Sequence, residues 1–90
     1  MKQYTANFLA SRNADGHTPL LCEWCWEAQM VDVHHVVMMG MGGNKNLDQA
    51  DNLIGLCREC HEAAHRNELS VDELLDRVEL ILGVMKAGEA

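Results

Sequence analysis

The most regular pattern of apolar and polar positions lies near the C-terminal end of the chain. Apolar residues recur at helical spacing from position 71 to position 85, and mostly charged residues fill the positions between them. Ser70 and Glu73 have the spacing of a capping box, and Leu69 and Leu74 occupy the positions of a hydrophobic staple. The pattern therefore predicts an amphipathic helix that starts after Ser70 and buries its apolar side against the rest of the chain.

Leu80 and Val84 fall outside this apolar stripe and widen it near the end of the helix. Either they cover the N-terminal segment of the same chain, or they form a contact with a partner, which would be a second copy of the chain or another protein. The pattern alone leaves both interpretations open.

Shorter apolar segments in the middle of the chain have the composition of β-strands. Residues 30–37 are rich in β-branched side chains, and residues 52–56 form a second, shorter apolar run. Glycines and asparagines from position 40 to position 46 predict a loop between them. Residues 59–67 have helical composition, so this region is predicted to form a strand, a loop, a strand and a helix.

The 90 residues are enough for one domain, which we divide into three parts. Residues 1–20 carry only weak signals of secondary structure and are expected to be loosely ordered or to form a short helix. Residues 21–67 hold the predicted core, and residues 68–90 hold the amphipathic helix that packs on it. Because a chain this short buries a small fraction of its surface, a structural metal is the expected additional source of stability.

Four cysteines form two Cys-x-x-Cys pairs, Cys22 with Cys25 and Cys57 with Cys60. Zn²⁺ favours sulfur ligands, and a two-residue spacer lets one turn of chain present two thiolates. Two disulfides in a secreted protein are the alternative, but such local bridges would be cramped, and the N-terminus carries no charged and then apolar leader. We therefore expect one structural Zn²⁺ in a reduced, cytoplasmic protein. No apolar run is long enough to span a membrane.

The net charge of −7 is unusual for a protein that binds nucleic acid, because such proteins usually present a basic surface. The negative charge is unevenly distributed. Residues 68–90 hold six acids and two bases, whereas residues 34–67 hold four acids and three bases. The region that carries the candidate chemistry is therefore close to neutral.

The remaining candidates for chemistry are four histidines and one asparagine: His34, His35, Asn52, His61 and His65. His61 and His65 are four residues apart on the predicted helix, so their side chains project from one face about one turn apart. With the thiolates assigned to zinc, these residues suggest a second metal site, one that is open to water and suited to catalysis.

Taken in order, these segments resemble the HNH endonuclease family, whose core is the ββα-metal fold. Asp32 to Val37 resembles its first strand motif, Gly42-Gly43 its loop, Asp51 to Leu56 its asparagine motif, and Cys57 to His65 its closing helix. The resemblance covers roughly residues 20 to 66. It implies a small α+β protein with a ββα-metal core, stapled by a four-cysteine zinc knuckle as in the zinc-containing subtype of the family.

The resemblance also implies a role for each candidate residue. His35 would be the general base, and Asn52 would either position the His35 ring or tie down the loop beneath it. His34 and His61, with His65 as a further ligand, would hold one catalytic divalent cation. Ligands of this type accept Mg²⁺, Mn²⁺, Ni²⁺, Co²⁺ or Zn²⁺. An imidazole suits the task of the base, because its unperturbed pKa lies near neutral pH.

Strand geometry adds two expectations about this region. Adjacent side chains on a flat strand point to opposite faces, so His34 and His35 can address one point only if the strand is strongly twisted or bulged. We expect strong local twist. Asp32 shares a face with His34, and we favour a hydrogen bond from a ligand imidazole to its carboxylate over metal ligation or simple solvation.

Few cations stand near the candidate site. After the first strand the chain reads Met38-Met39-Gly40-Met41, which lacks the basic residues that would grip phosphates. Lys45, Arg58 and Arg66 are the candidates for phosphate contacts, so DNA affinity is expected to be modest and sensitive to salt. His17 lies outside the motif and is expected to be solvated. Trp24 and Trp26 are expected to pack over the zinc knuckle and not to stack on bases.

The function predicted from these residues is a metal-dependent DNA endonuclease or nicking enzyme. One alternative is a zinc-ribbon module that binds nucleic acid or protein without cleaving it, which the acidic balance favours. Such a module would have no use for the histidines and the asparagine in this order. Another alternative is a nuclease subunit that acts only when a partner supplies the basic surface.

Overall fold

The computed structural model describes residues 2–38 and 47–88. They form, in chain order, α1 (Gln3–Ser11), β1 (Asp32–His35), the 3₁₀ turn η1 (Ala50–Asn52), β2 (Leu53–Leu56), α2 (Arg58–His65) and α3 (Val71–Gly88). The predicted order of strand, strand, helix and amphipathic helix is confirmed, although β1 is shorter than the predicted strand over 30–37. The predicted loop over 40–46, with Gly42-Gly43 and Lys45, lies outside the described residues.

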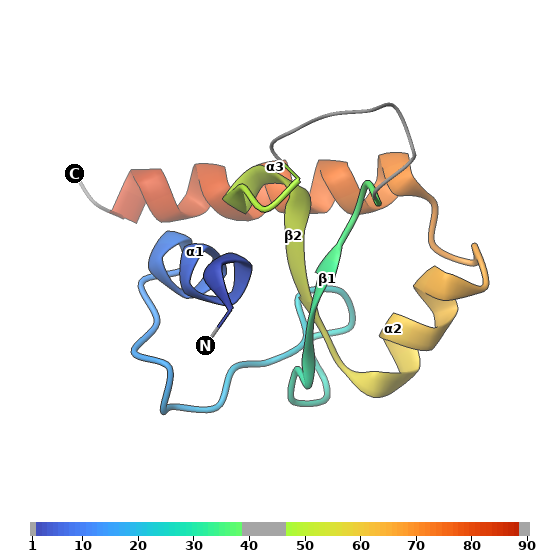
Figure 1. Cartoon of the computed structure of the whole chain (residues 1–90), viewed down its shortest axis with the longest axis horizontal. Coiled ribbons are helices and arrows are strands. Elements are labelled where there is room, and N and C mark those ends of the chain that lie inside the picture. Colours follow the sequence, from blue (N-terminus) through green and yellow to red (C-terminus); the bar gives the residue numbers. More distant parts are fainter. Residues whose placement is uncertain (1, 39–46, 89–90) are drawn as a thin grey trace.

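The two strands form an antiparallel hairpin at the centre of the molecule. Pairing is one to one from Asp32 with Leu56 to His35 with Leu53, so no bulge interrupts it. Every residue of β2 is buried. Figure 1 shows the reason: α1 lies on one side of the hairpin, α2 lies on the other, and α3 runs across one end. A strand covered on both sides needs a continuous apolar run, which the sequence of β2 supplies.

Helix α1 is anchored in the core by one aromatic residue and one ion pair. Phe8 is completely buried. The Arg12 guanidinium donates to the Glu23 carboxylate at 2.9 Å and to the Leu53 carbonyl at 2.7 Å. The same carboxylate accepts from the backbone N–H of Gly55 at 3.0 Å. Residues 1–20, which carry the weakest sequence signals, are thus tied by Arg12 to the segment that holds Cys22 and Cys25 and to β2.

Helix α3 begins as its sequence predicts. The Ser70 hydroxyl accepts from the Glu73 N–H at 3.1 Å, and the Glu73 carboxylate accepts from the Ser70 N–H at 3.3 Å. Leu74, Val78 and Ile81 are buried in the core. α3 is the longest helix described, and within the described residues no helix is long and apolar enough to cross a membrane.

Leu80 and Val84 remain 63% and 62% exposed on α3. They therefore do not cover the N-terminal segment of the chain, which was one of the two interpretations of their position. The other interpretation, a contact with a partner or a second copy, stays a prediction.

Candidate metal centres and active site

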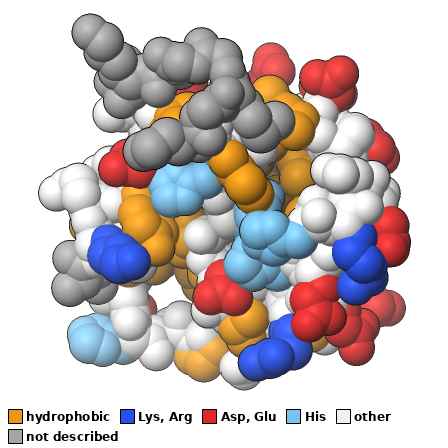
Figure 2. All heavy atoms as spheres, turned by 45° about the vertical axis from the view of Figure 1, so that its right-hand side comes forward, with side chains coloured by type: hydrophobic (Ala, Val, Ile, Leu, Met, Phe, Trp, Pro, Cys, Tyr) orange, Lys and Arg blue, Asp and Glu red, His pale blue; other side chains and the backbone are white. Residues whose placement is uncertain are grey.

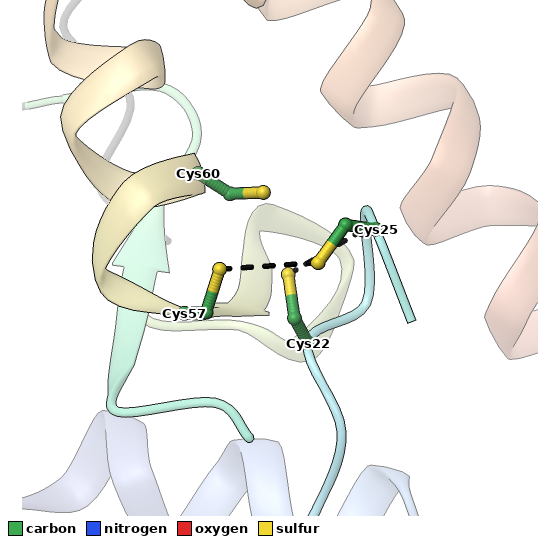
Figure 3. A group of neighbouring side chains, drawn as sticks. All are labelled: Cys22, Cys25, Cys57 and Cys60. Carbon is green, nitrogen blue, oxygen red and sulfur yellow. Dashed lines mark hydrogen bonds between the residues drawn. The ribbon is translucent and has the colours of Figure 1, made fainter. Parts of the chain in front are cut away.

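The four cysteines converge from two distant parts of the chain. Cys22 and Cys25 lie in the turn before β1, while Cys57 ends the run from β2 and Cys60 lies in the first turn of α2. Figure 3 shows their sulfur atoms directed toward one another. All four sulfurs lie within 4.8 Å of one another, and the four cysteines are free thiols.

The backbone of the first knuckle, the turn that holds Cys22 and Cys25, favours an ionised Cys22 sulfur. The N–H groups of Trp24 and Cys25 donate to the Cys22 sulfur at 3.4 and 3.5 Å. Burial raises the pKa of Cys22, but hydrogen bonds from backbone N–H groups outweigh it and lower that pKa to about 7. Burial and the neighbouring sulfurs raise the pKa of Cys60. Four sulfurs this close would repel one another as thiolates, so a cation at the centre would stabilise the ionised cluster.

The cluster has the size of a zinc site. A tetrahedron of sulfurs about 2.3 Å from zinc has edges of about 3.8 Å. The Cys25 and Cys57 sulfurs are 3.9 Å apart. The donor set, its dimensions and the N–H groups around Cys22 therefore fit Zn²⁺.

Three histidines form a second cluster between β1 and α2. One ring nitrogen from each of His34, His61 and His65 lies within 4.8 Å of the other two. The Nε2 atoms of His61 and His65 are 3.0 Å apart, because the two residues are one helical turn apart on α2. His34 comes from β1 and is buried, whereas His65 is exposed. The cluster is therefore closed on the side of the sheet and open toward solvent.

The surroundings of this cluster keep imidazole nitrogens available as ligands. Burial, and then the neighbouring imidazoles of His61 and His65, lower the pKa of His34 to about 4, so this ring is neutral at neutral pH. The Nδ1 atom of His61 lies 3.0 Å from the Asp32 carboxylate, which can only accept a hydrogen bond. Nε2 of His61 then keeps its lone pair for a metal. This is the contact with an imidazole that the sequence favoured for Asp32.

His35 lies outside this cluster, and the regular pairing of β1 shows no bulge that would bring its side chain to the point that His34 addresses. Its Nε2 atom lies 2.8 Å from the Asp48 carboxylate, and the Tyr4 ring lies edge-on at 4.6 Å between ring centroids. Its side chain is 27% exposed. His34 and His35 therefore contact different side chains, and the expected strong twist of β1, which would let both act at one phosphate, stays a prediction.

Asn52 ties the loop between the strands at both ends. Its side chain accepts from the Val37 N–H at 2.8 Å and donates to the carbonyl oxygens of Val37 at 3.0 Å and Leu47 at 2.9 Å. All its described side-chain hydrogen bonds go to the backbone, and none goes to His35 within the described residues. Asn52 was expected either to position the His35 ring or to tie down the loop beneath it. Its contacts are those of a residue that ties down the loop.

The cations expected to contact DNA differ in their surroundings. Arg58 is exposed at the start of α2, whereas Arg66 at the end of α2 donates to Glu68 at 2.6 Å. Lys45 lies outside the described residues. Figure 2 shows histidine side chains gathered near the middle of the face around the second cluster, with a few basic and more acidic side chains toward its edges. This face lacks a continuous basic patch among the residues described.

The two tryptophans do not behave alike. The Trp24 ring stacks on the Arg77 guanidinium at 4.4 Å, and Arg77 also donates to the backbone carbonyls of Glu23 and Trp24. Trp24 therefore packs beside the zinc knuckle as expected, but Trp26 is 50% exposed. His17 is exposed in a turn held by Asp15, as expected for a solvated residue.

Sequence reasoning missed the residues that surround His35. Asp48 lies three residues before Asp51, where the asparagine motif begins, and Tyr4 lies outside every motif. No spacing rule connects either residue to His35. The one available signal was chemical: a carboxylate in the loop that leads from β1 to β2 is close enough in sequence to reach a strand histidine.

These elements define a small α+β protein with a central hairpin, a four-cysteine cluster and a histidine cluster that can hold a second metal. Residues 22–67 match the HNH endonuclease family. The match begins at the first cysteine and includes both clusters, and it covers half of the chain. The protein belongs to the HNH endonuclease family.

One curated relative is anaredoxin from Nostoc sp., which is 33% identical over 52 residues. The aligned part is 57% of this chain and 64% of anaredoxin, so the chain spans less than two thirds of that protein. No solved structure matches the chain.

Proposed function

We propose that the protein is a metal-dependent DNA endonuclease or nicking enzyme. The observation that supports this most directly is the approach of His34 to His61 and His65, which places three imidazole nitrogens within 4.8 Å at the open edge of the family's core. Three imidazoles beside an open face are suited to hold one divalent cation and leave positions for water and substrate. In this proposal the catalytic cation is Mg²⁺, Mn²⁺, Ni²⁺, Co²⁺ or Zn²⁺.

His35 is the proposed general base. Hydrolysis of a phosphodiester requires water to lose a proton as its oxygen attacks phosphorus, and an imidazole can take that proton near neutral pH. The bond between phosphorus and the departing sugar oxygen then breaks, and that oxygen gains a proton from solvent. A bound divalent cation would supply positive charge against the negative charge on the phosphate and the departing oxygen. Asn52 supports the site by tying both ends of the loop.

A plasmid-nicking assay with purified, zinc-loaded protein tests this function. Supercoiled plasmid should become nicked when one of the five divalent ions is added and should stay intact in EDTA. Circular dichroism in the same EDTA concentration must show that the zinc knuckle is still folded, so that lost cleavage is not lost structure. His17→Ala is a matched control, because it removes an exposed imidazole outside the site. If no ion supports nicking by folded protein, the protein is not an endonuclease by itself.

A second candidate is a nuclease subunit that cuts only with a partner. It is favoured by the net charge of −7 and by the pairing of Arg66 with Glu68, which together leave few cations for DNA. Leu80 and Val84 on α3 offer apolar surface for such a contact. In this case, folded protein alone would bind its divalent ion at the histidines but would not nick DNA. A binding module without catalysis would lack that ion and would retain only zinc.

A further inference from the structure

His35 is held by two side chains that are not part of the histidine cluster. Its Nε2 atom is 2.8 Å from Asp48 Oδ1, and its ring meets the Tyr4 ring at 4.6 Å with an interplanar angle of 66°. The first contact fixes one edge of the imidazole, and the second limits rotation of its plane. Together they leave the ring one well-defined orientation.

Asp48 is held in turn by helix α1. The side-chain amide of Asn7 donates to the backbone carbonyl of Asp48 at 2.9 Å, and the side-chain amide of Gln3 donates to Asn7 Oδ1 at 2.9 Å. The helix is fixed to the core by buried Phe8 and by the ion pair of Arg12. A series of contacts therefore runs from the core through α1 to Asp48 and His35.

We propose that Asp48, Tyr4 and Asn7 position His35 for catalysis, so that α1, which lies outside the residues matched to the family, is part of the active site. This inference rests on the proposed nuclease function. The three residues are positioning residues, because they act through the imidazole and not on the substrate.

The chemistry of the Asp48 contact specifies which nitrogen acts as the base. A carboxylate can only accept a hydrogen bond, so the proton of the neutral ring resides on Nε2. Nδ1 then carries the lone pair and is the atom that takes the proton from water. An open hollow of about 370 Å³ lined by Tyr4, His35, Met38, Leu47 and Asp48 leaves room for water beside the ring.

A purely structural role explains the Asp48 contact less well. The Asp48 side chain is 56% exposed, and an exposed ion pair or hydrogen bond of this kind adds little to stability. What the contact does determine is the tautomer and orientation of the ring. A histidine next to an acceptor carboxylate is the arrangement by which proteins fix an imidazole for proton transfer.

The test compares Asp48→Ala, Asp48→Asn and a charge control, Asp51→Asn. Alanine removes the acceptor, whereas asparagine keeps a neutral one. We expect Asp48→Ala to lower kcat for nicking by roughly 10- to 100-fold with little change in KM for DNA, and Asp48→Asn to recover a large part of that loss. Asp51 is exposed within η1, and its variant removes the same charge without touching His35. Equal effects of Asp48→Ala and Asp51→Asn would mean that loss of a negative charge alone matters and would overturn the inference.

The contribution of α1 is tested with Tyr4→Phe and Tyr4→Ala. Phenylalanine keeps the ring that meets His35 and should retain the wild-type kcat, whereas alanine should lower kcat and leave KM unchanged. Thermal melts must show that both variants keep the fold. A folded Tyr4→Ala variant with wild-type kcat would show that α1 is not part of the active site.

A spectroscopic measurement separates this inference from the nuclease function. Nitrogen-15 shifts of the His35 ring in zinc-loaded protein should report a proton on Nε2 in the wild type and a mixture of tautomers in Asp48→Ala. A wild type with its proton on Nδ1 would overturn the positioning contact even if the protein cuts DNA. If the protein cuts no DNA but shows the Nε2 proton, the contact is supported while the proposed function fails.

Discussion

His34 and His35 are neighbours in the chain whose side chains meet different surroundings. His34 is 4% exposed and joins His61 and His65, whereas His35 turns to Asp48 and Tyr4 on the other side of the strand. Alternation along a regular strand produces this division without any bulge. In the proposed function, this division assigns His34 to the cation and His35 to the water that attacks phosphorus.

This division predicts opposite responses to added metal. His35→Ala should lower the nicking rate by roughly 10² to 10⁴, the usual contribution of a positioned general base, without changing metal occupancy. His34→Ala should weaken binding of the catalytic cation, so a higher metal concentration should restore part of its activity. Nicking rates measured over a metal titration, with His17→Ala as the control, distinguish the two roles. If added metal restores the activity of His35→Ala but not that of His34→Ala, then His35 is the cation ligand and His34 is the general base.

At the scale of elements, the contact between β2 and α1 depends on the absence of a side chain at Gly55. A Cβ at this position would lie 2.6 Å from the Met30 sulfur and 2.9 Å from the Phe8 ring. Met30 can move, but Phe8 is completely buried and has little room to give way. This close approach lets the backbone of β2 reach the carboxylate of Glu23.

We therefore expect Gly55→Ala to lower the free energy of unfolding by about 1–3 kcal/mol through overpacking. Urea denaturation of zinc-loaded protein measures this. The matched control is Gly83→Ala on α3, where a Cβ meets no atom within 4 Å. That variant should be neutral or more stable by about 0.5–1 kcal/mol, because alanine is the better helix former. Equal stability of the two variants would show that β2 and α1 are less tightly packed than this contact implies.

At the scale of the whole molecule, the four-cysteine cluster joins the segment before β1 to the junction of β2 and α2. Arg77 extends this connection to α3 by donating to two carbonyls of the first knuckle. Since the apolar core is small, a metal at this cluster would hold together elements that local contacts leave separate.

Loss of this metal should therefore unfold the entire domain. Cys57→Ser removes one of the four sulfurs, and we expect it to lose both bound zinc and helical signal in circular dichroism. Zinc content is measured by atomic absorption on the same samples. A variant that binds no zinc but melts cooperatively near the wild-type temperature would contradict the structural role of the cluster.

The small number of cations in the molecule that could contact phosphates predicts how DNA binding depends on salt. If Lys45, Arg58 and Arg66 are the phosphate contacts, about three counterions are released, and DNA affinity should fall roughly 40-fold between 50 and 200 mM salt. Binding measured by fluorescence anisotropy over this range gives the slope. A much steeper dependence would indicate cations beyond these three, and no measurable binding at low salt would favour the subunit that needs a partner.

The spacing of residues along the chain determined the local features of this protein. The two Cys-x-x-Cys pairs, the separation of His61 and His65 by one helical turn, and the capping box of α3 each depend on neighbours within four residues, so the sequence predicts them directly. The ordered motifs also indicate the family and its ββα core, because they depend on residue types and order and not on long-range contacts.

Only the tertiary structure decided which distant residues meet. The contact of Asp48 and Tyr4 with His35, the backbone role of Asn52, the buried ion pair of Arg12 with Glu23 and the exposure of Leu80 and Val84 follow no periodicity. Each depends on how α1, the hairpin and α3 pack together, and that packing is set by the summed burial of many side chains. The spacing of residues along the chain predicts which face of its own strand or helix a residue occupies. It does not predict which side chain from another element will contact that residue.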